Sequence, residues 1–161
     1  IPRQISKPVP DSPTMPPIRS QIVFESSEGT GGNGWPWGRF FIHIMDSDGG
    51  NLRLLTDEAA GGGVVHEVAP ALSPDGTRIA FANWKNISVM DVDGRNVQRL
   101  IRSRSSYASY HFSSPAWSPD GTQIAFESYR DGAYNIFVMD ADGGNVRQLT
   151  KWYRYDVDPD W

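Results

Sequence analysis

Three segments of the chain repeat the same pattern of residues, and this repetition restricts the possible folds more than any other feature. Each segment carries a Met–Asp pair, at Met45–Asp46, Met90–Asp91 and Met139–Asp140, and these pairs are 45 and then 49 residues apart. A short apolar stretch precedes each pair, and a turn rich in Asp, Gly and Asn follows it. The pattern predicts a chain built from repeated copies of one small structural unit.

Each repeat divides into short strands separated by turn residues. In the third repeat the strands read PAW, TQIAFES, NIFVMD and NVRQLT, and we name them A, B, C and D. The SPDG turn between A and B uses proline to set one φ and glycine to accept a positive one. In strand B, Ile124 and Phe126 flank Ala125, so a bulky face alternates with a small one. This alternation predicts a strand packed between two sheets.

Strand D has apolar residues three apart, and we interpret it as an edge strand with a bulge. No stretch shows the apolar period of a helix, so the predicted fold class is all-β. A period of about 45 residues with four antiparallel strands is typical of a β-propeller blade.

The words PAWSPDGTQIAFES and IFVMDADGGNVRQLT resemble the TolB-type propeller repeat, a WD-like repeat, and the resemblance covers residues 21–161. The resemblance implies a six-bladed β-propeller. The repeats predict three blade units, at 21–56, 69–101 and 114–150, of which the second and third hold all four strands, and a final A strand at 158–161. Residues 1–20 hold six of the twelve prolines and are predicted to form an extended arm.

The first unit holds strands B, C and D, but the proline-rich arm takes the place of its A strand. Three blades do not close a ring, since propellers have about four to eight. Our leading hypothesis is a head-to-tail homodimer with six blades, in which each copy completes the first blade of the other. This exchange requires that the last tryptophan neither hangs free in solvent nor folds back into its own molecule. The predicted assembly residues are Ile22, Phe24, Asp158, Pro159 and Trp161.

Two other assemblies fit the same strand count. In the first, the chain is half of a longer polypeptide. In the second, copies of the chain add head to tail into an open fibre. Native mass separates the three, because the dimer has twice the chain mass and a stable monomer excludes it.

Composition excludes several classes of partner. Lysine and arginine number 15 against 19 acidic residues, a net charge of −4, which argues against nucleic acid as a partner. No stretch approaches the roughly 18 to 20 apolar residues of a membrane span, so we expect no direct membrane insertion. The sequence starts at Ile1, which fits a processed chain. We expect a periplasmic or extracellular location, which the resemblance to TolB-type proteins also implies.

The sequence contains no motif for catalysis. It lacks the GxSxG elbow of the hydrolase domains that accompany some propellers of this type, as well as HExxH and phosphate-loop motifs. The DxDG turns are not EF-hand loops, because position twelve is Asp57, Arg102 or Lys151. Cysteine is absent. We therefore expect no enzymatic activity, no cofactor and no bound metal.

Two groups of residues are candidates for binding. The connections from strand D to the innermost strand A should border the central channel, where they bind a peptide, sugar or metal or only line the entrance. These channel-mouth candidates are His66, Glu67, His111, Tyr155 and Asp156. The loops supply further aromatic and basic side chains of the kind that protein contacts use. These loop candidates are Trp35, Trp37, Arg102, Arg104, Tyr107, Tyr110, Trp152 and Tyr153.

The function that we expect is non-enzymatic protein binding or scaffolding. The partners are a second copy of the chain and another protein, bound through the loops or the proline-rich arm. Two alternatives stay open: an accessory propeller of a hydrolase or peptidase, and a carbohydrate-binding propeller that stacks sugars on Trp35 or Trp37.

Overall fold

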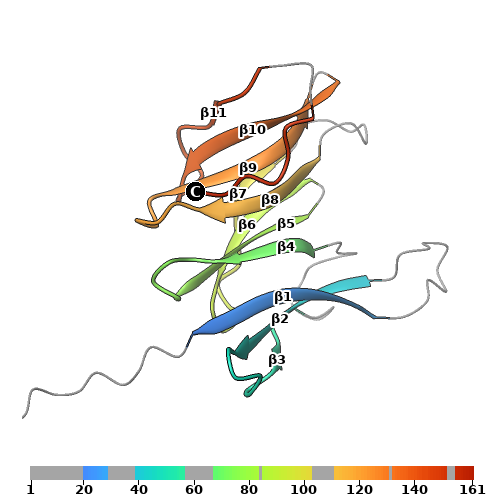
Figure 1. Ribbon diagram of the computed structural model, residues 1–161, viewed down its shortest axis with the longest axis vertical. Coiled ribbons are helices and arrows are strands. Elements are labelled where there is room, and N and C mark those ends of the chain that lie inside the picture. The colour runs from blue at the N-terminus through green and yellow to red at the C-terminus, as the bar shows by residue number, and fades with distance from the viewer. Residues whose placement is uncertain are drawn as a thin grey trace, which may run out of the picture.

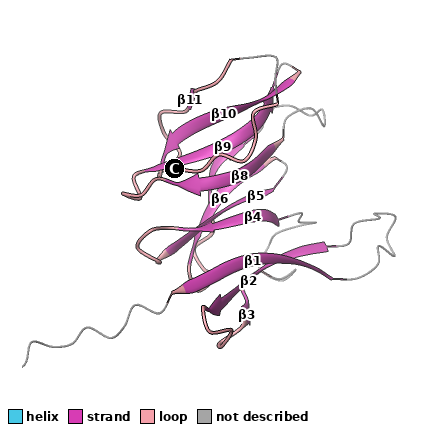
Figure 2. Cartoon of the chain, in the orientation of Figure 1, coloured by secondary structure: helices cyan, strands magenta, loops and turns pink. Residues whose placement is uncertain are grey.

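A computed structural model of the chain describes residues 20–28, 39–56, 67–83, 85–102, 111–130, 132–151 and 155–161. Within these residues the chain forms strands in three antiparallel sheets and no helix. The sheets are stacked on one another in chain order, as Figures 1 and 2 show. The predicted all-β fold class is confirmed.

Each sheet is a meander whose strands follow the order of the chain. The first sheet contains β1 (Gln21–Glu28), β2 (Arg39–Asp46) and β3 (Arg53–Leu54). The second contains β4 (Glu67–Leu72), β5 (Arg78–Asn83), β6 (Asn86–Asp91) and β7 (Gln98–Arg102). The third contains β8 (Phe112–Trp117), β9 (Gln123–Arg130), β10 (Ala133–Asp140) and β11 (Arg147–Gln148). The strands predicted as B, C and D in the first repeat, and as A to D in the other two, are all present.

Irregular pairing occurs in two kinds of strand. The register of β7 against β6 shifts, so the bulge predicted for strand D is confirmed in the second sheet. The A strands β4 and β8 also shift register, which the sequence pattern did not indicate. At this shift Ala69 and Ser114 have φ of 51° and 48°, and Pro70 and Pro115 follow them. A bulge accommodates proline, because the residue is not required to donate to the neighbouring strand.

The side chains of β5 fill the spaces on both sides of the second sheet. Ile79 and Phe81 pack against Ile42 and Ile44 of the first sheet. On the opposite face, Ala80 and its neighbours pack against the third sheet. The predicted alternation of a bulky and a small face is confirmed. Full burial of a side chain such as Phe81 contributes about 1.5–3 kcal/mol to folding.

The SPDG turns between strands A and B are closed by an aspartate. The Asp120 carboxylate accepts hydrogen bonds from Ser118 Oγ at 2.6 Å, from Thr122 N at 3.0 Å and from Thr122 Oγ1 at 2.8 Å. These bonds, the one from Ser118 above all, lower the pKa of Asp120 from 3.8 to about 2. Asp75 makes the same bonds one repeat earlier, led by the one from Ser73, and its pKa is also lowered.

Candidate functional site

The antiparallel order of the strands separates the connections into two ends of the molecule. The A–B and C–D turns lie at one end, which we call the turn end. The B–C connections and the connections from D to the next A leave from the other, which we call the loop end. Figure 1 shows the strand ends of β1, β5 and β9 at this end, on the right of the view.

Many of the predicted site residues fall outside the part of the chain that the structure describes. For Glu67 the structure gives the backbone, at the start of β4, and not the side chain. The candidates outside the described residues are Trp35, Trp37, His66, Arg104, Tyr107, Tyr110, Trp152 and Tyr153. The remaining candidates are Arg102, which ends β7, and His111, Tyr155 and Asp156.

His111 and Asp156 are both held by the third sheet at its loop end. The backbone carbonyl of His111 accepts a hydrogen bond from Tyr129 N at 3.0 Å, at the end of β9. The backbone N–H of Asp156 donates to the carbonyl of Tyr134 at 3.2 Å, at the start of β10. The two D-to-A connections therefore meet the same pair of strands, β9 and β10.

Three tyrosines form a cluster beside these residues, which we call the tyrosine cluster. The ring centroids of Tyr129 and Tyr134 are 4.9 Å apart, and those of Tyr134 and Tyr155 are 5.9 Å apart. Burial raises the pKa of Tyr134, and Glu127 and the other two tyrosines add to the effect. The hydroxyl of Tyr134 therefore stays protonated at neutral pH and can donate a hydrogen bond. Aromatic rings with a polar tip are enriched at protein contact sites.

Sequence reasoning singled out Tyr155 but missed Tyr129 and Tyr134. The signal was the stretch ESYRDGAY, in which a short B–C turn joins two strands. In an antiparallel hairpin the residues that flank such a turn face each other, and Tyr129 and Tyr134 are direct partners.

Two glutamates of strand B hold the A strand of the next repeat. Glu25 Oε2 accepts a hydrogen bond from Ala69 N at 2.8 Å, and Glu127 Oε2 accepts one from Asp158 N at 3.2 Å. Asp158 has a φ of 52°, close to the 51° of Ala69. Sequence reasoning missed both glutamates, although they occupy the same place in β1 and β9. The segment 155–161 therefore shares with strand A a residue of positive φ at the same place and the same carboxylate contact.

The last tryptophan lies against the third sheet of its own chain. Trp161 Nε1 donates to the carbonyl of Ala116 at 3.0 Å, as Trp117 Nε1 donates to the carbonyl of Ala71 at 3.1 Å. The expectation that Trp161 makes no contact with its own molecule is therefore wrong. The physical reason is that an A strand contacts the A strand before it as well as its own strand B, as Trp117 does with Ala71. The requirement stated from the sequence was therefore too strict, because an exchanged segment would make this same contact with its own chain. Trp161 remains 50% exposed, and within the described residues 155–161 pair with no strand.

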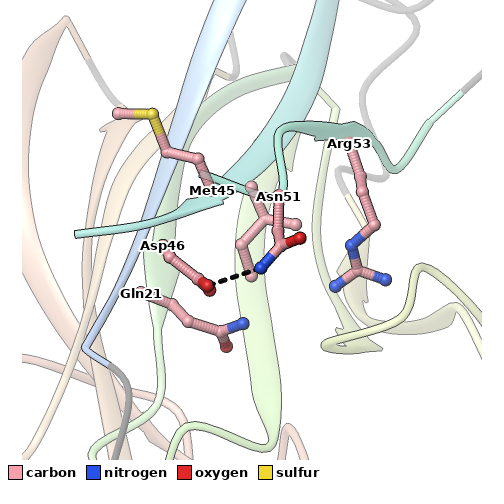
Figure 3. A pocket seen from close by; sticks show the side chains of 6 residues that line it. Gln21, Met45, Asp46, Asn51 and Arg53 are labelled. Carbon is pink, nitrogen blue, oxygen red and sulfur yellow. Dashed lines mark hydrogen bonds between the residues drawn. The ribbon is translucent and has the colours of Figure 1, made fainter. Parts of the chain in front are cut away.

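A hollow of about 310 Å³ lies at the turn end of the first sheet, away from the predicted channel mouth. Figure 3 shows Asp46, Asn51 and Arg53 around it. Asn51 Nδ2 donates to Asp46 Oδ2 at 2.7 Å, and Asn96 donates to Asp91 at 2.6 Å in the next repeat. These bonds close the C–D hairpin turns, so the prediction that the DxDG segments are hairpin turns is confirmed.

The described residues limit what else the site can hold. Among them, no group of three or more His, Asp or Glu side chains is arranged to bind a metal ion. Nor do they contain a helix of the length and apolar character that a membrane span requires.

The model of the TolB β-propeller domain family matches residues 18–161, which is nearly the whole chain. The chain belongs to the TolB β-propeller family. The second and third sheets of this TolB-type chain have the four-strand order of a propeller blade, and the first sheet has strands B, C and D of that order. Among curated proteins, none matches it by sequence.

Solved structures resemble the TolB-type propeller over part of their length. A protein of Agrobacterium tumefaciens assigned as TolB is 31% identical, with a TM-score of 0.57 over 70% of this chain and 43% of its own. TolB from Acinetobacter baumannii is 19% identical, with a TM-score of 0.60 over 81% of this chain and 30% of its own. Puromycin hydrolase is 22% identical, with a TM-score of 0.57 over 88% of this chain and 23% of its own. The chain thus spans less than half the length of each, and the last two likenesses show the fold alone.

Proposed function

We propose that this TolB-type propeller is a non-enzymatic protein-binding scaffold that assembles by passing its C-terminal segment to a second copy. The observation that carries this proposal is an unmatched pair of strand edges. Segment 155–161 shares with strand A the positive φ at Asp158 and the contact with a strand-B glutamate, but it has no strand B beside it among the described residues. β1 is a strand B at the edge of its sheet, and among the described residues no strand A lies beside it. Unpaired strand edges recruit partners.

The binding surface is the loop end. Its described residues include the exposed ring of Tyr155, the tyrosine cluster behind it and the carboxyl group of Asp156. One carboxylate oxygen of Asp156 is buried without a hydrogen-bond partner in the described structure. A partner group that donates to this oxygen would remove the cost of burying it alone. A peptide supplies both backbone donors and apolar side chains, and so fits this surface. We propose a location outside the cytoplasm, where the resemblance to TolB-type proteins also points.

Purification of the tagged chain from its native source tests the binding function. We expect a non-enzymatic protein to accompany the chain, and to be lost when Tyr155→Ala and Asp156→Ala are combined. The double variant should keep the native mass of the parent. A co-purified hydrolase that processes a substrate only with the propeller attached would replace this proposal with the accessory role. Glycan binding that is abolished by Trp35→Ala and Trp37→Ala would replace it with the carbohydrate-binding role.

A further inference from the structure

The hollow at the turn end of the first sheet is lined by four polar and two apolar residues. Its volume is about 310 Å³, at the lower end of the roughly 300–1,000 Å³ typical of small-molecule sites. Gln21 lies directly opposite Asp46, and Arg53 directly opposite Ile44. Residues paired in this way share a face of the sheet, and on this face Ile44 packs against the second sheet. The polar side chains of the hollow therefore belong to the side of the first sheet that the second sheet covers.

Comparison of the repeats shows why this space is open. Between the second and third sheets, the guanidinium group of Arg78 lies over the ring of Trp117, 4.8 Å from the ring centroid. The first repeat has Gln21 in the place of Arg78 and Leu72 in the place of Trp117, while the third repeat keeps the tryptophan as Trp161. Both side chains of the first repeat are shorter. The first repeat therefore leaves unfilled a space that the chain fills with its own arginine and tryptophan in the second.

The charges around this space differ between the repeats as well. Arg78 lies directly opposite Asp91, so in the second repeat the chain supplies a cation beside the carboxylate at the end of strand C. In the first repeat the neutral Gln21 lies opposite Asp46, and the arginine is on strand D instead, as Arg53. Asp46 is 6% exposed. A carboxylate this buried is stabilised by a cation beside it.

Arg53 restricts the kind of cation that the hollow can hold. Figure 3 shows Asp46 and Arg53 on either side of Asn51. A bare cation would be attracted by Asp46 and repelled by Arg53. A ligand that also carries a carboxylate replaces this repulsion with charge-assisted hydrogen bonds, of which a guanidinium and a carboxylate can form two at once. The hollow therefore offers one charged partner to each end of a small zwitterion.

We propose that the hollow binds a guanidino acid of the arginine type, with the guanidinium group of the ligand at Asp46 and its carboxylate at Arg53. The guanidinium group of the ligand takes the place that Arg78 has in the second repeat, where Gln21 leaves room for it. The methylene groups of the ligand lie on Ile44, in the apolar part of the wall. Free arginine and a peptide that ends in arginine both carry these groups. The site lies at the turn end, so it is independent of the loop-end surface proposed above.

Titration followed by two-dimensional NMR tests the ligand. L-Arginine should shift the amide signals of Gly50 and Asn51 in a saturable way, while the signals of β9 stay unchanged. Agmatine, which is arginine without the carboxylate, should bind at least about tenfold more weakly, because it loses the charge-assisted bonds to Arg53 and keeps the repulsion. Equal affinity for the two compounds, or no saturable shift with millimolar arginine, would overturn the proposal.

The tripeptide Gly-Gly-Arg separates the two sources of the ligand. Tighter binding of the tripeptide than of L-arginine would support the site and identify a peptide end as the source. Weaker binding of the tripeptide would support the site with the free amino acid as its ligand.

Gln21→Arg tests where the guanidinium group binds. This variant copies the second repeat, in which Arg78 holds the same place, so the fold should tolerate it and arginine binding should be lost. Gln98→Arg is the matched control, because it makes the same chemical change at an exposed position of the second sheet. The control should leave the affinity for arginine unchanged. Unchanged binding in Gln21→Arg, or equal losses in both variants, would overturn the placement of the guanidinium group.

Arg53→Gln tests the partner of the carboxylate. Arg53 is exposed, so the variant should keep the unfolding free energy of the parent. Its affinity for arginine should fall at least about tenfold, and the preference for arginine over agmatine should disappear, because attraction and repulsion are removed together. Arg147→Gln, at the same place in the third repeat, should change neither quantity. A preference for arginine that persists in Arg53→Gln would overturn the role of Arg53.

Discussion

Replacing Gly94 by alanine tests how closely successive sheets approach each other. The residue has a φ of +87°, and a Cβ built on it would lie 2.7 Å from the carbonyl oxygen of Leu55 and 3.5 Å from the carbonyl carbon and Cα of that residue. All three atoms belong to the backbone of the neighbouring repeat, so no side-chain rotation relieves the contact. One of the two strands has to move.

The expected loss of stability has two parts. An alanine with left-handed φ costs about 1–2 kcal/mol relative to glycine, and Gly76→Ala, at a φ of +70° with no described atom within 4 Å of the Cβ, isolates this part. Overpacking against a fixed neighbour adds about 1–3 kcal/mol. Gly94→Ala should therefore lower the free energy of unfolding by about 2–5 kcal/mol, of which about 1–3 kcal/mol exceeds the loss in the control.

Urea unfolding followed by tryptophan fluorescence measures both losses. The slope of free energy against urea should be the same for both variants, because neither changes the surface exposed on unfolding. Equal losses in Gly94→Ala and Gly76→Ala would refute the close approach of the second sheet to Leu55.

Three further predictions follow from the turns and from the C-terminal segment. The lowered pKa of Asp120 means that folding favours its carboxylate, so this stabilisation is complete above pH 3.8 and is lost as the pH falls towards about 2; acid titration of Asp120→Asn should show a smaller drop in the unfolding free energy over that window. Glu127→Gln replaces the charged acceptor of Asp158 N with a neutral one, and hydrogen exchange at that amide should become several-fold faster, with unchanged rates in β5. Trp161→Phe removes the bond from Nε1 to the Ala116 carbonyl and should lower the free energy of unfolding by about 0.5–1.5 kcal/mol, as measured by urea unfolding.

The strands and their turns could be predicted from the sequence because local chemistry determines them. In the SPDG turns, proline, aspartate and glycine act within a few residues of one another, so Asp75 and Asp120 close the same turn twice. The alternation of Ile79 and Phe81 with alanine likewise reflects a strand with a sheet on either side. The family resemblance followed from the same repeated sequence motifs.

The candidate site was less accessible to sequence reasoning. Tyr155 could be singled out from its place before strand A, but its contact with Tyr134 depends on how the D-to-A connection crosses the third sheet. The hydrogen bond from the Ala69 amide to the Glu25 carboxylate joins residues 44 positions apart. No local period encodes such a contact, because it arises only when two sheets are stacked.

The sequence by itself therefore determined the repeat, the strands and the turns, since each depends on interactions within one unit. Only the tertiary structure decided which faces of those units are covered. In all three repeats strand B supplies an Ile and a Phe, and strand C a Met, to one face of the sheet. These side chains are buried in the second and third sheets, while Ile22 of the first sheet is 42% exposed. The physical reason is that burial depends on the neighbouring sheet as well as on the residue. The same sequence motif is therefore buried in the middle of the stack and exposed at its end.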